Sequence, residues 1–381
     1  VYGLIISAYS AFQFIGAPWL GRMSDSTGRK PILVITQAGT LFSWFVFGAA
    51  WFVPDITVGW VALPLIVIAL ARMLDGITGG NVSVTQAYVS DISTHAEKSY
   101  IFASIGGIAG FGFIVGPGLG GFLASTQYGF LGVALAGAAI STVTLLSIHF
   151  MLKESLPPDE RKPPANQPLS HSVRLLKRIK DLDPPQIIKR LFVVRGLFAA
   201  MMAAYISTIA LYVIDLFKFD SATLGYFMLA VGVFMIFNQA VVSRWFIRRF
   251  GEVPTMRMGL VLCAIGLFAV TLTENLYLYF AFYYVLNLGI SLSIPTFNTL
   301  TAQHADPKDM GEVMGIASSL ISLSNAVIPV FAATLYGLIG ESFYHLTAIL
   351  PIMALLMARK ITACETEAPP TPGPLGEHEV L

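Results

Sequence analysis

Two ionisable residues lie deep inside a long apolar stretch of this sequence. Within residues 60–90, Arg72 and Asp75 fall about 18 Å and 22 Å from Trp60 at the helical rise of about 1.5 Å per residue. An unpaired charge at that depth costs roughly 2.5–3.5 kcal/mol if it faces lipid. Because a membrane carboxylate beside a guanidinium can take up and release a proton, we expect Arg72 and Asp75 to couple proton movement to function. An alternative stays open: the two charges, one turn apart, only neutralise each other and fix the helix to its neighbour.

Further polar and small residues share a helix face with this pair. Arg72, Asp75, Gly76 and Ser90 recur at spacings of three and four with three residues that we expect to line a solute pathway, Gly79, Ser83 and Gln86. Polar or aromatic residues near the centres of other apolar segments are candidates for the same pathway: Tyr9, Phe12, Gln13, Tyr205 and Asn287. For any single one of the later residues, an ordinary hydrogen bond between helices is the alternative.

A basic, glycine-punctuated hairpin at Gly21–Lys30 separates the first two apolar segments. Gly21 and Gly28 permit sharp turns, Asp25 can accept hydrogen bonds from Arg29, and Arg29 with Lys30 favours a cytoplasmic location. We expect this loop to act as a gating latch, with contacts that form in the outward-open state and break when the inner gate opens. The alternative is a loop that only anchors the topology.

The segment around residue 117 carries a glycine and proline run. Gly112, Gly116 and Gly120 fall on one helix face, where another helix could approach closely, and Pro117 removes a backbone hydrogen bond just before Gly120 and Gly121. This run predicts a tight hinge that closes against leakage.

Composition requires a membrane around these residues. The chain has 381 residues, of which 55% are hydrophobic and 12% charged, and a single soluble core cannot enclose so much apolar surface. We predict eleven spanning helices, at 2–20, 31–53, 60–90, 100–124, 130–152, 191–214, 222–247, 254–273, 275–299, 312–338 and 342–359.

The charge distribution fixes domains and sidedness. Basic residues gather in alternate connections, which predicts a multi-pass cell-membrane protein with its central linker and C-terminus in the cytoplasm. We expect an N-terminal bundle at 1–152 with five spans, a linker at 153–190, a C-terminal bundle at 191–360 with six spans, and a disordered tail at 361–381.

The hairpin, the pattern Arg72-x-x-x-Gly76 and the run from Gly112 to Gly121 resemble motifs of the major facilitator superfamily. The first 155 residues are most similar to the tetracycline-resistance branch of drug:proton antiporters. The resemblance implies an all-α membrane fold of two pseudo-symmetric bundles, with eleven of twelve usual spans and the first one missing. It also implies export of a small amphipathic compound in exchange for protons.

A nutrient or sugar symporter of the same fold is the alternative function. No spacing of His, Cys or acidic residues indicates catalysis, a metal or a cofactor, and no basic pattern indicates nucleic acid. The expected partners are the solute, protons and lipid, and the expected state is a monomer.

Overall fold

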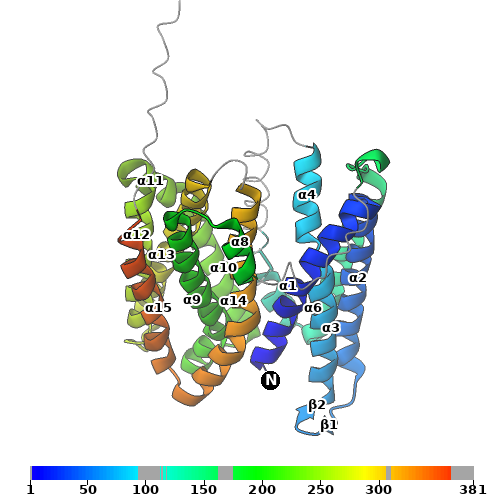
Figure 1. Cartoon of the computed structure of the whole chain (residues 1–381). Coiled ribbons are helices and arrows are strands. Elements are labelled where there is room, and N and C mark those ends of the chain that lie inside the picture. Colours follow the sequence, from blue (N-terminus) through cyan, green and yellow to red (C-terminus); the bar gives the residue numbers. More distant parts are fainter. Residues whose placement is uncertain are drawn as a thin grey trace, which may run out of the picture.

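The computed structural model describes residues 2–92, 112, 115–116, 118–161, 175–305 and 310–361, and these residues are mainly helical (Figure 1). The first group of elements is α1 (Tyr2–Thr27), α2 (Arg29–Ala49), η1 (Ala50–Phe52), β1 (Thr57–Val58), β2 (Val61–Ala62), α3 (Leu63–Gly79), α4 (Val82–Ile92), α6 (Gly129–Met151) and η2 (Pro158–Glu160). The second group is α8 (Leu175–Leu182), α9 (Gln186–Phe217), α10 (Ser221–Phe237), the π-helix η3 (Asn238–Val242), α11 (Ser243–Phe250), α12 (Glu252–Ala269), α13 (Leu276–His304), α14 (Met310–Ile339) and α15 (Ser342–Ala358).

Helices α1, α2, α3 and α6 pack on one another through small residues. Helix α3 lies against both α1 and α2, and α6 covers the other side of α2. A Cβ at Gly76 would collide with the Tyr9 carbonyl oxygen, and a Cβ at Gly16 would lie 2.6 Å from the Ile77 carbonyl oxygen. Glycine at both positions therefore lets α1 and α3 cross at close range, as small residues do in membrane proteins.

The later helices enclose a larger core. Helix α9 packs against α14 and α15, and α12 packs closely on α13. Most of the large side chains with less than 2% exposure belong to this group, including Tyr279, Tyr283 and Tyr344. Two of its helices begin with a side-chain cap: Asp220 accepts from the Thr223 amide, and Asn275 from the amides of Tyr277 and Leu278.

Nine helices of the described residues are long and apolar enough to cross a membrane, and they match nine of the eleven predicted spans. The eleventh prediction corresponds to α15, which is apolar but has only 17 residues. The fourth, at 100–124, lies mostly outside the described residues.

The third predicted span differs in detail. It begins after a two-stranded antiparallel ribbon whose turn contains Gly59 at φ +66°, and it breaks between Gly79 and Val82. Gly80 and Asn81 occupy the break, and both residue types have low helix propensity.

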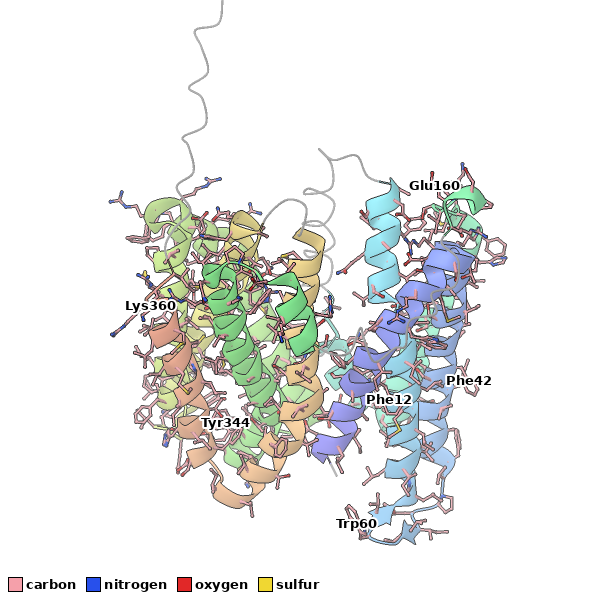
Figure 2. All side chains as sticks on the ribbon, viewed as in Figure 1. Phe12, Phe42, Trp60, Glu160, Tyr344 and Lys360 are labelled. Atoms are coloured by element: carbon pink, nitrogen blue, oxygen red, sulfur yellow. The ribbon has the colours of Figure 1, made fainter. Side chains whose placement is uncertain are left out.

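We call the two ends of the molecule the ribbon end, at β1 and β2, and the basic end, at Gly28 and Gly251. Figure 2 shows Trp60 at the ribbon end, with Glu160 and Lys360 nearer the basic end.

The two groups of helices meet in the half of the molecule nearer the ribbon end. Gly3, in the first turn of α1, lies so close to α14 that an added Cβ would be 2.6 Å from the Pro329 carbonyl oxygen. A Cβ at Gly121 would collide with the Cα of Gly225 in α10, and one at Gly118 would lie 2.7 Å from Leu229. Both contacts depend on residues without side chains.

Candidate functional site

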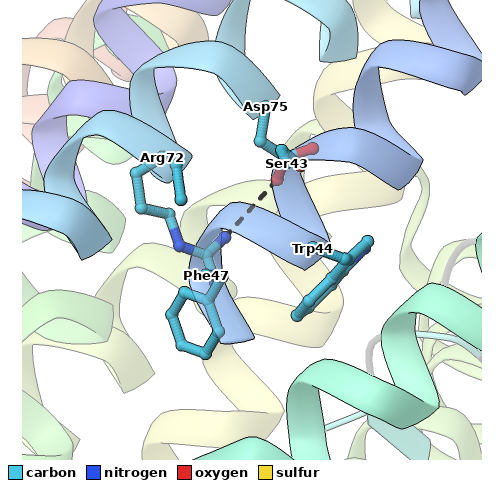
Figure 3. A pocket seen from close by; sticks show the side chains of 6 residues that line it. Ser43, Trp44, Phe47, Arg72 and Asp75 are labelled. Carbon is cyan, nitrogen blue, oxygen red and sulfur yellow. Dashed lines mark ion pairs between the residues drawn. The ribbon is translucent and has the colours of Figure 1, made fainter. Parts of the chain in front are cut away.

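Arg72 and Asp75, both of α3, form an ion pair where α3 meets α2, with 3.6 Å between the Arg72 Nη1 and the Asp75 Oδ2 (Figure 3). Their side chains are 34% and 16% exposed. Because an α-helix has 3.6 residues per turn, residues three apart lie on one side of α3, and both charged groups are on the face that meets α2.

Aromatic rings of α2 hold the guanidinium. The Arg72 Cζ lies 5.9 Å from the Trp44 ring centroid and 5.5 Å from the Phe47 ring centroid. Cation–π attraction is worth about 0.5–1 kcal/mol at exposed sites and about 2 kcal/mol when the groups are desolvated. These two rings therefore stabilise the positive charge in addition to the carboxylate.

Hydroxyl groups of α2 surround the carboxylate. Ser43 and Thr40 are close enough to Asp75 to interact with its carboxylate electrostatically. The Ser43 hydroxyl donates to the Thr40 carbonyl at 2.7 Å, and the Thr40 hydroxyl lies 3.0 Å from the Thr78 hydroxyl. Beside the pair is a cavity of about 10 Å³, lined by Ser43, Trp44, Phe47, Ala71, Arg72 and Asp75. That volume corresponds to about one water molecule. The arrangement can hold a carboxylate in either protonation state within reach of a proton carrier.

Three predicted pathway residues gather beside this pair. The Gln13 Nε2 donates to the Gly79 carbonyl at 3.0 Å and lies 3.4 Å from the Tyr9 hydroxyl. Tyr9 is also within electrostatic range of Asp75 and Arg72. The structure thus brings a residue pair of α1 to the polar face of α3.

The other members of the predicted stripe serve different contacts. The Phe12 Cβ lies against Gly76, and Ser83 donates to the Ala17 carbonyl at 2.9 Å, so both positions belong to the packing of α1. Gln86 is exposed on α4. The stripe therefore borders two helices, and only part of it surrounds the ion pair.

Tyr205 and Asn287 form interhelical hydrogen bonds in the later group of helices. The Tyr205 hydroxyl is bonded to that of Tyr283, and the Asn287 side chain pairs with Asn238 at 3.2 Å. Tyr284 donates to the same Asn238 at 2.8 Å. In this conformation Tyr205 and Asn287, which were predicted to line the solute pathway, therefore make ordinary hydrogen bonds between helices, as the alternative expected.

The hairpin at Gly21–Lys30 is organised around Arg29, which is only 8% exposed. Its guanidinium lies 2.6 Å from Asp25, 3.1 Å from Asp91 and 2.7 Å from the Ser24 hydroxyl. Gly21 lies near Ser83, and Gly28 adopts φ +108°, a backbone conformation that favours glycine. The predicted contact between Asp25 and Arg29 is thus present, within a larger network.

Two members of this network were not identified from the sequence. Asp91 lies near the end of α4 and pairs with Arg29. Glu154 follows α6 and accepts from four backbone amides, those of Arg29, Lys30, Ser155 and Leu156. Burial opposes ionisation of Glu154, but the four amides outweigh it and hold its pKa below the usual value. An acidic residue just after each of two apolar segments, opposite a basic loop, is the signal that could have indicated both.

The glycine and proline run makes its close contacts through a different face from the one predicted. Within the described part of the chain, a Cβ at Gly112, Gly116 or Gly120 would meet open space, whereas Gly118 and Gly121 touch α10. Pro117 lies outside the described residues.

Comparisons with known proteins identify the family of the chain. The profile of the Major Facilitator Superfamily matches residues 1–329 and 245–377. Major facilitator superfamily domain-containing protein 10 of Bos taurus is 28% identical over 94% of this chain and 78% of its own length. The class D tetracycline resistance protein of Salmonella ordonez is 25% identical over 90% of this chain and 81% of its own length.

Two solved structures share the architecture. The human organic anion transporter TETRAN superposes with a TM-score of 0.70 at 26% identity, over 93% of this chain and 83% of that one. A D-xylose-proton symporter gives 0.68 at 16% identity, over 95% and 87%. With nine helices in the described residues that are long and apolar enough to cross a membrane and a family profile over most of its length, this multi-pass membrane protein belongs to the Major Facilitator Superfamily of transporters.

Proposed function

We propose that this protein exports a small amphipathic compound in exchange for protons, by alternating access at the cell membrane. The ion pair of Arg72 and Asp75 carries this proposal, because the carboxylate lies in a spanning helix beside a guanidinium and two hydroxyls. The similarity to tetracycline resistance proteins supports an exported drug-like compound.

The energy comes from proton movement through the membrane potential. Moving one charge across 100 mV releases about 2.3 kcal/mol. Protonation of Asp75 removes its attraction to Arg72, so the guanidinium keeps only its contacts with Trp44 and Phe47. The protonation state of Asp75 therefore changes the contact between α2 and α3, and a proton can favour one conformation over the other.

The basic end faces the cytoplasm in this proposal, because Lys and Arg residues of the hairpin, of α11 and of the segment after α15 gather there. The contacts of Gly3 and Gly121 across the two groups of helices then lie nearer the exterior. The conformation is accordingly closed toward the outside.

The hairpin contacts of Arg29 are intact in this conformation, which the proposal assigns as closed toward the outside, so they favour the alternative that the hairpin anchors the topology over a latch that breaks when the inner gate opens. Arg29 links Asp25 of α1 to Asp91 of α4, so movement of either helix end changes the geometry of both pairs. The run from Gly112 to Gly121 is, in this proposal, the tight hinge that closes against leakage. The bundles at 1–152 and 191–360 are the bodies that move, with a monomer as the functional unit.

Reconstitution in proteoliposomes tests the coupling. An imposed proton gradient is expected to drive uptake of tetracycline into inside-out vesicles containing the wild-type protein. Asp75→Asn is expected to abolish this uptake and to keep normal membrane insertion. The matched control is Asp220→Asn, because Asn also caps helices and Asp220 lies outside the site. Proton-driven uptake by Asp75→Asn at the wild-type rate would contradict the proposal.

The direction of flux separates the antiporter from a symporter. An antiporter moves the solute against the inward proton flow, whereas a symporter moves both the same way. The sequence identity to the D-xylose symporter is only 16%, so this similarity shows the fold alone. Uptake of the solute together with protons, in vesicles of known orientation, would replace the antiporter with the symporter.

A further inference from the structure

Helix α11 carries three arginines and no acidic residue within eight residues. Arg244, Arg248 and Arg249 are all exposed. Among the described residues, none of the three makes an ion pair. The acidic residue nearest in sequence, Glu252, instead accepts a hydrogen bond from the Gln303 side chain at 3.3 Å. The positive charge of α11 is therefore uncompensated within the described part of the chain.

The end of the helix accounts for only two of these charges. Arg248 and Arg249 lie in the last turn of α11, where cations interact favourably with the helix dipole. Arg244 lies one turn earlier and gains little from that end. Since Arg244 and Arg248 are four residues apart, their like charges repel each other across one helical turn. An anion bound between them would replace this repulsion with attraction to a shared partner.

The position of α11 along its span corresponds to the headgroup level of a bilayer. The span Ser221–Phe250 continues from α10 through η3 into α11, and Figure 1 shows α11 at the basic end of the molecule. Arg244 lies about 35 Å from Ser221 at the helical rise of about 1.5 Å per residue. The hydrocarbon core of a bilayer is about 30 Å thick. Arg244 is therefore beyond the core when Ser221 lies at the opposite boundary.

An aromatic cluster on α11 marks the same level. The Trp245 ring centroid lies 5.1 Å from that of Phe246 and 6.0 Å from that of Phe250. Trp245 is 58% exposed and Phe250 is 46% exposed. Exposed aromatic rings of spanning helices are typical of the membrane interface, where an indole ring lies among the lipid headgroups. The rings thus indicate, independently of charge, the plane in which phosphate groups meet the arginines.

The arginines and Trp245 face away from the protein. Ser243 is fully buried, and its hydroxyl donates to the Ser291 carbonyl of α13 at 2.7 Å. At about 100° of rotation per residue, Arg244, Trp245 and Arg248 all lie about 100° or more from Ser243 around the helix. They therefore border the surrounding membrane at its boundary with water.

We propose that α11 binds the headgroup of an anionic phospholipid, with Arg244 and Arg248 donating to its phosphate group and Trp245 lying beside it. Arginine is suited to this contact because its guanidinium donates paired, charge-assisted hydrogen bonds to phosphate oxygens. The uncompensated charge of α11 favours a lipid with net negative charge over a zwitterionic one. This site is separate from Arg72 and Asp75, so the inference goes beyond the proposed function and holds whichever compound is transported.

Tryptophan quenching measures which lipid lies beside α11. Phenylalanine replaces Trp19, Trp44, Trp51 and Trp60, so that Trp245 is the only indole of the full chain. The bilayers contain equal amounts of phosphatidylglycerol and phosphatidylcholine, with bromine atoms on the acyl chains of one lipid or the other. Because bromine quenches a tryptophan that it contacts, the two bilayers report the relative occupancy of the position beside Trp245. We expect phosphatidylglycerol to be preferred by at least about tenfold.

Variants separate a defined site from general attraction to a basic surface. Arg244→Gln should lower the preference about fivefold, because one arginine close to an anionic surface contributes about that factor. Arg244→Lys should retain most of the preference. The matched control is Lys153→Gln, because Lys153 is an exposed cation that follows α6 in the other group of helices. This control should leave the preference unchanged.

Thermal unfolding of the chain with its natural tryptophans gives a second readout. Nanodiscs that contain phosphatidylglycerol should raise the Tm of the wild type above its value in phosphatidylcholine, and Arg244→Gln should lose this increase. In phosphatidylcholine alone the two chains should have the same Tm, because Arg244 is exposed and makes no ion pair with any described residue. A lower Tm of Arg244→Gln in phosphatidylcholine would show a structural contact in place of a lipid site.

Four results of the quenching experiment would overturn the assignment. These are equal quenching by the two brominated lipids, an unchanged preference in Arg244→Gln, an equal loss of preference in Lys153→Gln, and displacement of phosphatidylglycerol by inorganic phosphate in solution. The third result would show general attraction to the basic end. The fourth would assign the site to a soluble phosphate.

Discussion

The contact of Gly121 with Gly225 predicts that one added methyl group changes the conformational balance. A Cβ at Gly121 would collide with the Gly225 Cα and would lie 2.9 Å from both the Gly225 amide nitrogen and the Ser221 carbonyl oxygen. The obstacle is backbone on every side, so no side-chain rotation relieves it. Gly121→Ala should therefore disfavour the conformation in which the ribbon ends of the two helix groups meet.

The size of the effect follows from overpacking. Extra methyl groups in tightly packed regions cost about 1–3 kcal/mol. Because about 1.4 kcal/mol is tenfold in an equilibrium constant, the ratio of the two conformations should change by a factor of about 5–150. Such a change converts a minor state into a substantial one.

Distances between spin labels on opposite bundles measure this ratio. Cysteines replace the exposed residues Thr27 and Arg249 at the basic end, Cys364 is changed to serine, and buried Cys263 is retained. In Gly121→Ala the distance distribution should shift toward shorter values, because opening the ribbon end closes the basic end. Gly120→Ala is the matched control, since its Cβ meets open space among the described residues and its gain in helix propensity is the same. Identical distributions for the two variants would refute the reasoning.

Three further outcomes are expected. Arg29→Gln should lower the free energy of unfolding by about 2 kcal/mol, because it leaves Asp25 and Asp91 without their shared partner. In the same thermal unfolding assay, the control Arg248→Gln, on the exposed face of α11, should change the free energy of unfolding little. Because folding lowers the pKa of Glu154, its contribution to stability is present above its unfolded pKa and is lost as pH falls through its folded pKa. Glu154→Gln should therefore reduce the loss of Tm on acidification below about pH 5. An unchanged loss of Tm on acidification in this variant would argue against the four amide contacts. Asn287→Leu should destabilise the protein by about 1–3 kcal/mol because Asn238 loses a buried partner, while Asn298→Leu at an exposed position of the same helix should be nearly neutral.

Hydrophobic runs and basic loops made most spanning helices predictable. Nine helices with the required length and hydropathy lie where apolar stretches had indicated them, because a membrane requires each span to satisfy its own backbone hydrogen bonds. The break between Gly79 and Val82 was not predicted, since residues 60–90 are apolar enough on average to span a membrane and hydropathy does not register the low helix propensity of Gly80 and Asn81.

The candidate site was predictable only in part. Spacing alone placed Arg72 beside Asp75. The partners from α2, Trp44 and Phe47, depend on which neighbouring helix α3 meets, and helical periodicity carries no such information. For the same reason the glycine run suggested a close contact but not that Gly118 and Gly121 would make it.

Glu154 has a mechanical consequence for any transporting movement. Its carboxylate receives the first amides of α2, while Ser155 beside it donates to Asp91 at the end of α4, and Asp91 holds Arg29. Three helix termini that are distant in sequence, the start of α2 and the ends of α4 and α6, are thereby tied together at a single junction. A rocking motion must carry these termini as one rigid block, so the bending needed for transport has to occur elsewhere along the helices.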